Sequence, residues 1–177
     1  MPGYGDIPVV SIVGRGNSGK TTFVVKLIAE LTERGYAVAT VKHHQHDFET
    51  DIEGKDSWRH AQAGSLASMV SSPNKLSIVR KVDRERTIAE LVEEAERTGA
   101  DILLTEGFKL EGADKFELSR KARGLDPALA VEDVVGLITD DDELARAYRD
   151  AGKPIYALDD IERFADDLVE TYLGEGD

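Results

Sequence analysis

The 177-residue sequence predicts an α/β three-layer sandwich, in which helices cover both faces of a mainly parallel central sheet. Two observations predict this class. Short apolar segments rich in β-branched residues alternate with segments whose apolar residues recur every three or four positions, and such alternation builds parallel sheets with helical crossovers. A glycine-rich turn also separates the first apolar segment from the first helical pattern. The length fits a single domain spanning residues 1–177.

The N-terminal part of the chain has the clearest pattern. Ile7–Val13 is rich in β-branched residues, which suits a buried parallel strand. Lys20–Arg34 has helical spacing and is followed by Gly35, the residue type that most often ends a helix. Tyr36–Val41 is then expected to form a second strand. A strand, loop, helix and strand in this order form a right-handed crossover unit.

The alternation continues through the rest of the chain. Short apolar runs predict further strands at 65–71, 76–82, 102–105, 134–138 and 155–158. Helical spacing predicts helices at 57–63, 87–97, 142–150 and, after a capping aspartate at 159 or 160, along a terminal apolar stripe from 161 to 172.

Composition narrows the range of functions. The 22 basic and 35 acidic residues give a net charge of −13, which repels phosphate backbones and anionic lipid, so neither nucleic acid nor a membrane is expected as a partner. Cysteine is absent, which excludes disulfides, cysteine-ligated metals and a thiol nucleophile. No apolar run approaches the ~20 residues of a membrane span, and no secretory leader is recognised. We therefore expect a soluble, cytoplasmic protein.

The glycine-rich turn, Gly14–Thr22, matches the phosphate-binding pattern G-x-x-x-x-G-K-[ST] and lies between a predicted strand and a predicted helix. Its glycines allow the backbone N–H groups to turn inward as an anion nest, to which the helix N-terminus adds its dipole. Lys20 is expected to reach the β- and γ-phosphates, and Thr21 to bind Mg²⁺. The pattern therefore predicts a P-loop NTPase fold that binds a nucleoside triphosphate. The expected nucleotide ligands are Gly14, Arg15, Gly16, Asn17, Ser18, Gly19, Lys20, Thr21 and Thr22.

Two charged residues are candidates for catalysis and metal binding beside this loop. Arg15 occupies the second loop position, where a guanidinium could stabilise phosphate charge, including that of a nucleotide on a partner subunit. The alternative is an exposed arginine without a catalytic role. Glu106 follows the apolar strand 102–105 and precedes a glycine. It is expected to hold Mg²⁺, although aspartate is usual at such a position; the alternative is a solvated strand-end carboxylate.

The segment 42–53 follows the second strand and is rich in charged residues and histidine. Its position predicts an active-site switch in which Asp47 orients the attacking water or a metal-bound water. The alternatives are a solvated polar loop and a zinc site formed by the histidines His43, His44 and His46. The candidate catalytic residues are therefore Lys20, Asp47 and Arg15.

Selection of the base is only weakly encoded. The segment Asn74-Lys75-Leu76-Ser77 begins like the guanine-reading pattern N-K-x-D but lacks its aspartate. Asp140, just after the predicted strand 134–138, is a better-placed candidate for a guanine contact. Capping of the following helix by Asp140 or Asp141 explains the same residues equally well.

Four segments together resemble the family of molybdopterin-guanine dinucleotide biosynthesis protein B (MobB). They are Gly14–Thr22, the V-K-H-H-Q-H-D-F-E motif of 41–49, residues 54–64, and the T-E-G-F-K motif of 105–109 that leads to K-F-E-L-S-R at 115–120. The likeness spans residues 8 to about 140.

The resemblance implies a dimeric, GTP-binding accessory protein with weak, Mg²⁺-dependent GTPase activity. It would assist a molybdenum cofactor guanylyltransferase that joins GMP to molybdopterin. By matching position, Thr21 and Glu106 would hold Mg²⁺, and Asp47 would belong to the switch. The residues placed near the site or a partner surface are Lys109, Glu117 and Arg120. The alternative function is that of a small-molecule ligase or kinase resembling dethiobiotin synthetase, which also pairs a P-loop with a strand-end glutamate and glycine.

Overall fold

The computed structural model describes residues 5–44, 48–109, 113–124 and 126–174. The chain divides into two compact units, residues 1–43 with 87–177 (unit 1) and residues 44–86 (unit 2). Unit 1 holds the large sheet and most of the helices, and unit 2 holds one short helix and a hairpin. The single domain expected for residues 1–177 stays a prediction.

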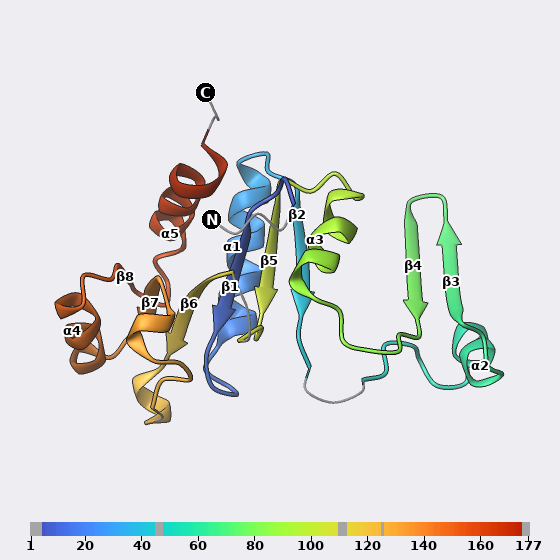
Figure 1. Ribbon diagram of the computed structural model, residues 1–177, viewed down its shortest axis with the longest axis horizontal. Helices are drawn as coiled ribbons and strands as arrows, with labels where there is room; N and C mark the ends of the chain where they lie inside the picture. Colours follow the sequence, from blue (N-terminus) through green and yellow to red (C-terminus); the bar gives the residue numbers. More distant parts are fainter. Residues whose placement is uncertain (1–4, 45–47, 110–112, 125, 175–177) are drawn as a thin grey trace. The chain divides into compact units, whose positions relative to one another are not determined.

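Unit 1 is built on a six-stranded sheet. Its strands are β1 (Val9–Val13), β2 (Val38–Lys42), β5 (Ile102–Glu106), β6 (Asp114–Ser119), β7 (Gly136–Thr139) and β8 (Ile155–Tyr156). They pair in the order β2-β5-β1-β6-β7-β8, and every pairing is parallel (Figure 1). The predicted α/β class with a parallel sheet is confirmed. Because all strands run the same way, their carboxyl ends meet at one edge, where ligands bind in such folds.

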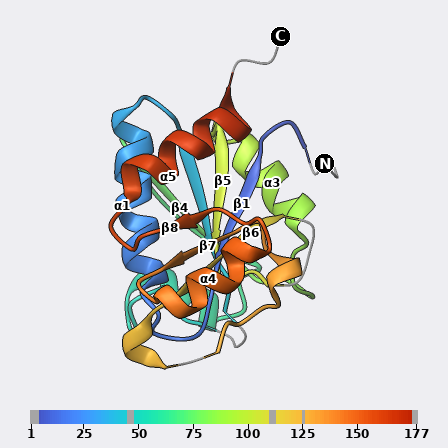
Figure 2. The same cartoon turned by 90° about the vertical axis from the view of Figure 1, so that its left-hand side faces the viewer.

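Helices cover both faces of this sheet. The helices α1 (Lys20–Glu33) and α5 (Ile161–Leu168) pack on one face, and α3 (Ile88–Glu96) and α4 (Asp142–Asp150) pack on the other. In Figure 2, α1 lies to the left of β5 and β1, and α3 lies to their right. None of the helices that the structure describes is long and apolar enough to cross a membrane.

The side chains of strand β1 pack against helices on both faces of the sheet. Val10 and Ile12 belong to the core formed with α1 and α5, whereas Val9 packs with α3 and Val13 with Tyr148 of α4. Successive side chains of a strand point to opposite faces. A sheet covered on both sides therefore requires the continuous apolar run that the sequence shows here.

Unit 2 contains α2 (Asp56–Gln62) and an antiparallel hairpin of β3 (Ala67–Ser72) and β4 (Lys75–Arg80). The hairpin pairs Met69 with Ile78, and these two large apolar side chains are 66% and 54% exposed. A two-stranded hairpin has little stability of its own in water. The exposed apolar side chains therefore need an explanation beyond the fold of this unit.

Strand β6 was not expected from the apolar pattern. Its only large apolar residues are Phe116 and Leu118, and they alternate with charged residues. Phe116 and Leu118 face the core shared with α1 and α5, while Glu117 is fully buried on the opposite face. A buried carboxylate inside a central strand breaks the apolar run on which strand prediction depends.

Candidate nucleotide-binding site

The loop predicted to bind phosphate joins β1 to α1 at the carboxyl edge of the sheet. Gly14 and Gly19 have φ angles of +147° and +104°, and Asn17 has a φ of +60°, conformations that residues with a Cβ seldom adopt. A side chain at Gly14 would also overlap the carbonyl oxygen of Leu118 in β6. The path of the backbone therefore requires glycine at this position.

The start of α1 offers polar groups to a ligand. Gly19 is the N-cap of this helix, and no side chain caps it, so the first N–H groups of α1 lack the usual side-chain acceptor. The Oγ of Ser18 is buried, and no hydrogen-bond partner for it lies in the part of the chain that the structure describes. Phosphate oxygens are the acceptors that such groups bind at a helix N-terminus.

Lys20 lies across the loop instead of extending into solvent. Its Nζ donates to the carbonyl oxygens of Gly14, at 3.0 Å, and Arg15, at 2.8 Å. Burial lowers the pKa of Lys20, and the nearby carboxylate of Glu106 opposes that shift. The ammonium therefore already lies beside the loop in which phosphate is expected.

Three polar side chains from three elements meet next to the loop. The Thr21 Oγ1, in the first turn of α1, donates to the two carboxylate oxygens of Glu106 at 2.8 and 2.9 Å. The Nζ of Lys42, at the end of β2, lies 3.4 Å from Glu106 Oε1 and 3.4 Å from Thr21 Oγ1. The glutamate side chain is 13% exposed. The structure therefore brings together the two predicted metal ligands and places a second ammonium against them.

The chemistry of the Thr21–Glu106 pair fits Mg²⁺. This ion prefers oxygen ligands and is usually held by one or two protein groups together with water and substrate phosphates. Among residues 5–44, 48–109, 113–124 and 126–174, no three His, Cys, Asp or Glu side chains gather as a metal cage. The pair would therefore serve Mg²⁺ bound to a nucleotide, and not a closed structural site.

The predicted switch is only partly described. Asp47 and His46 lie outside the described residues, so the expected role of Asp47 and the zinc alternative both stay predictions. The His43 ring packs 4.8 Å from the ring of Phe108, and its backbone N–H donates to the Glu106 carbonyl oxygen at 2.9 Å. The His44 ring lies 5.4 Å from that of Phe48.

Arg15 is held by its own chain. Its Nε donates to the carbonyl oxygen of Asp126 at 3.2 Å, and its Nη2 to that of Pro127 at 3.4 Å. Two long hydrogen bonds to carbonyl groups on an exposed side chain are readily exchanged for stronger bonds to phosphate. Action of Arg15 on a partner subunit's nucleotide stays a prediction.

The two adjacent aspartates after β7 have different partners. Asp140 Oδ1 accepts from the backbone N–H of Lys121 at 2.7 Å, so this side chain fixes the turn after β6. Asp141 is the N-cap of α4 and accepts from the N–H groups of Glu143, at 3.0 Å, and Leu144, at 3.3 Å. The capping alternative therefore applies to Asp141, while the guanine contact expected for Asp140 stays a prediction.

The resemblance placed Glu117 and Arg120 near the site or a partner surface, but sequence reasoning missed how the segment after β6 supports the loop. The Nε of Arg123 donates to the carbonyl oxygen of Asn17 at 3.2 Å, and the side chain of Arg120 lies beside Gly19. Glu117 Oε1 accepts from the N–H of Ala128 at 2.8 Å. A cluster of three basic residues within positions 120–123 of an otherwise acidic chain was the available signal for a phosphate-facing segment.

Comparison with known proteins gives one family. Residues 9–140 match the model of "Molybdopterin guanine dinucleotide synthesis protein B". The molybdopterin-guanine dinucleotide biosynthesis adapter protein of Escherichia coli is 30% identical over 173 residues, which cover 96% of each chain. The protein of the same name from Haemophilus influenzae is 38% identical over 115 residues, and that match spans 65% of each chain, just under two thirds of the relative.

Solved structures agree with this result. A crystal structure of Bacillus subtilis MobB superposes with a TM-score of 0.75 at 30% identity, covering 96% of this chain and all of that one. A structure titled molybdopterin-guanine biosynthesis protein B superposes with a TM-score of 0.67 at 28% identity. These likenesses cover both the sheet and the loop described above, and they confirm the P-loop NTPase fold.

Proposed function

The chain belongs to the MobB family, and from this premise we propose that it is a GTP-binding adapter in molybdenum cofactor biosynthesis. It would assist the attachment of GMP to molybdopterin, the step that gives molybdopterin guanine dinucleotide. The observation that carries the proposal is the contact of Thr21 with Glu106 beside the glycine loop. A hydroxyl and a carboxylate joined at the start of a P-loop helix are the protein groups that a magnesium–triphosphate complex needs.

In this proposal, different residues of the chain bind the phosphates of GTP, bind Mg²⁺ and orient the attacking water. The loop amides and Lys20 hold the β- and γ-phosphates, and Thr21 and Glu106 hold Mg²⁺, which neutralises phosphate charge when bound. Lys42 lies 3.4 Å from Glu106 and would contact the γ-phosphate side of the site. Asp47 is proposed to orient the attacking water. Hydrolysis is expected to be slow, because in this proposal the chain acts as an adapter for a partner enzyme.

The proposed partners are a molybdenum cofactor guanylyltransferase, molybdopterin and a second copy of this chain. The names of the relatives call them adapter proteins, which supports action through a partner enzyme. For the homodimer, the support is the uncovered apolar face of the hairpin, where Met69, Leu76 and Ile78 are 66%, 61% and 54% exposed. Exposed apolar patches of this kind mark interaction surfaces. The cytoplasmic location expected from the sequence stays a prediction.

The test is a reconstituted reaction. Formation of molybdopterin guanine dinucleotide is measured with purified guanylyltransferase, molybdopterin and GTP·Mg²⁺, with and without this chain. We expect the chain to raise the yield or rate, while its own GTP turnover stays slow. No effect on product formation, combined with fast triphosphate turnover that depends on an unrelated metabolite, would instead support a ligase or kinase resembling dethiobiotin synthetase.

A further inference from the structure

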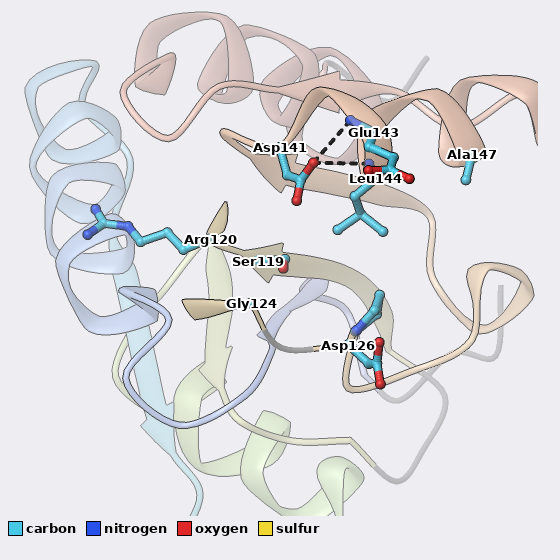
Figure 3. A pocket seen from close by; sticks show the side chains of 9 residues that line it. Ser119, Arg120, Gly124, Asp126, Asp141, Glu143, Leu144 and Ala147 are labelled. Carbon is cyan, nitrogen blue, oxygen red and sulfur yellow. Dashed lines mark hydrogen bonds between the residues drawn. The ribbon is translucent and has the colours of Figure 1, made fainter. Parts of the chain in front are cut away.

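A cavity of about 420 Å³ lies beside the glycine loop, between the start of α4 and the segment that follows β6 (Figure 3). Its volume falls within the roughly 300–1,000 Å³ of small-molecule pockets. The wall residues that matter for its chemistry are Asp126, Pro127, Asp141, Glu143, Leu144 and Ala147. All of them belong to unit 1.

The cavity is connected to the phosphate loop through its wall. The carbonyl oxygens of Asp126 and Pro127 accept the two hydrogen bonds of Arg15. Arg120, which also lines the cavity, extends away from α4 toward Gly19 at the start of α1 (Figure 3). A ligand with its phosphates in the loop would therefore reach the cavity with its other end.

The charge of the cavity wall limits which chemical group of the ligand, opposite its phosphates, can enter the cavity. The three carboxylates of Asp126, Asp141 and Glu143 outnumber the one guanidinium of the wall, that of Arg120, so the cavity is acidic on balance and disfavours a second phosphate or a carboxylate. Carboxylates accept hydrogen bonds and cannot donate them when ionised. The apolar groups of Leu144, Ala147 and Pro127 suit the faces of a flat ring. The cavity therefore fits a ring that carries N–H donors along one edge.

Of the carboxylates in the wall, that of Asp141 is best positioned to accept hydrogen bonds from the N–H donors of such a ring. Its Oδ1 is fixed by the two α4 amides, and its Oδ2 has no hydrogen-bond partner among the described residues. In Figure 3 the carboxylate lies at the start of α4, on the cavity side of the helix. A side chain locked by hydrogen bonds loses little conformational freedom when it binds. Glu143, by contrast, is an exposed helix side chain.

We propose that this cavity takes the guanine base of the bound nucleotide and that Asp141, not Asp140, reads it. The proposal rests on the GTP binding proposed above. Guanine presents a ring N1–H and an exocyclic amino group, both donors, to a carboxylate. Adenine presents an unprotonated ring nitrogen at the same place, so its lone pair would face the Asp141 oxygens. A site built to accept a hydrogen bond rejects the analogue that cannot donate it.

The test separates the base from the phosphates. Calorimetric titrations with GTP, ATP and inorganic tripolyphosphate, all with Mg²⁺, are run on the wild type, Asp141→Asn and Asp142→Asn. Asparagine caps helices as well as aspartate does, so the fold of the Asp141→Asn variant is retained. Asp142 is exposed, lies in the same turn and does not line the cavity, which makes Asp142→Asn the matched control. A second variant, Ala147→Leu, narrows the cavity at an exposed helix position.

We expect Asp141→Asn to lose at least ~10-fold in GTP affinity, one lost hydrogen bond to a charged group, and to bind tripolyphosphate as the wild type does. Ala147→Leu should weaken GTP but not tripolyphosphate, and Asp142→Asn should change neither. Unchanged GTP affinity in both cavity variants, with GTP and tripolyphosphate binding normally to the wild type, would overturn the base assignment alone. A wild type that binds neither GTP nor tripolyphosphate would overturn the proposed function and this inference together.

Discussion

Lys20 shows how one side chain can serve both the free and the bound loop. In the structure its ammonium donates hydrogen bonds to the carbonyl oxygens of Gly14 and Arg15, in the loop whose amides are proposed to bind phosphate. Burial lowers the pKa of Lys20, and an added phosphate would restore its preference for the charged form. The same group is therefore available to a triphosphate once one arrives.

Replacement of this lysine should weaken triphosphate binding. In Lys20→Ala we expect affinity for GTP·Mg²⁺ to fall by roughly 10- to 100-fold, because a charge-assisted hydrogen bond to phosphate is worth about 1.5–3 kcal/mol. Calorimetry with GTP measures this change. Lys26→Ala, which removes an exposed lysine elsewhere on α1, is the control and should bind as the wild type does. Equal affinities in all three proteins would refute the role given to Lys20.

A second prediction at this scale concerns Glu106. Glutamine keeps an oxygen that can accept from Thr21, but it removes the charge that a cation needs. Glu106→Gln should therefore weaken GTP binding in Mg²⁺ more than it does in EDTA, with the ratio of the two affinities falling several-fold. Titrations in both buffers measure the ratio, and Glu33→Gln on exposed α1 surface is the control. A loss of the same size in both buffers would point to a structural role for Glu106.

At the scale of elements, an aromatic cluster joins α5 to the sheet and to α1. Phe164 of α5 packs edge-on against Phe23 of α1 and Phe116 of β6, with ring centroids 5.2 and 4.8 Å apart. Tyr156 of β8 lies 4.8 Å from the same ring. Edge-to-face pairs add to the gain from burying the rings. Phe164 thus connects α5 to α1 and β6, which are distant from it in sequence, and to the preceding strand β8.

Truncating this ring should weaken the whole of unit 1. Phe164→Ala is expected to reduce the free energy of unfolding by about 3–5 kcal/mol, the usual range for removing a buried phenylalanine. Urea denaturation followed by circular dichroism measures the change, and Glu162→Ala, at an exposed position of α5, should stay close to the wild type. A loss below about 1 kcal/mol would show that the cluster is not part of the cooperative core.

Glu117 of β6 connects the sheet to the segment behind Arg15. Its Oε1 holds the Ala128 amide, and Oε2 has no hydrogen-bond partner in the described ranges. Burial raises the pKa of Glu117, while the hydrogen bond from Ala128 opposes that shift. The Glu117 charge and burial also raise the pKa of Tyr148 to about 12, burial being the larger cause. The segment 126–129 is therefore held, through the Ala128 amide, by a carboxyl group whose pKa is raised by burial.

This raised pKa predicts a pH-dependent stability. Because the unfolded chain releases the Glu117 proton at a lower pH than the folded chain does, the folded state loses stability as pH rises from the ordinary glutamate value through the raised one. The Glu117→Gln variant should not lose stability in this way, because glutamine does not titrate. The variant's free energy of unfolding, relative to the wild type, should therefore increase as pH rises from the ordinary glutamate pKa of about 4 through the raised one, by ~1.4 kcal/mol per unit of pKa difference. Urea titrations across this range measure it; a difference that is constant with pH would contradict the account.

These elements also show what sequence could predict. The limits of α4 match the prediction, since an aspartate cap and an amphipathic stripe are local signals. The order of the strands and the presence of β6 could not be predicted from local sequence patterns. Both depend on which segments, distant in sequence, pair with one another. The predicted metal pair, Thr21 and Glu106, comes together across 85 residues, which the strand-end rule for parallel sheets could anticipate. The cavity that α4 forms with the segment after β6 had no local signal.

At the scale of the molecule, the hairpin of unit 2 carries the apolar surface that we propose as the homodimer interface. Met69 and Ile78 are cross-strand partners, as are Ser71 and Leu76, so Met69, Ile78 and Leu76 share one face. Two such faces packed together would bury the apolar side chains that each copy leaves exposed. A homodimer would also provide the neighbouring nucleotide that a role of Arg15 in trans requires.

Placing a charge on this face should separate the copies. Sedimentation velocity is expected to show the wild type at twice the protomer mass and Ile78→Asp at the protomer mass, because an unpaired carboxylate is strongly disfavoured in an apolar interface. Ser77→Asp, on the opposite face of the same strand, is the control and should remain dimeric. A wild type that sediments as a monomer at all concentrations tested would refute the dimer, and with it the trans role of Arg15.

The most direct measurement for the whole account is binding of a non-hydrolysable GTP analogue to the purified wild type, followed by calorimetry with Mg²⁺ and with EDTA. One site per chain is predicted, occupied more tightly when Mg²⁺ is present, since Thr21 and Glu106 then have a cation to share with the phosphates. An absence of binding heat in both buffers, together with a failure of the analogue to protect the loop from hydrogen exchange, would contradict it.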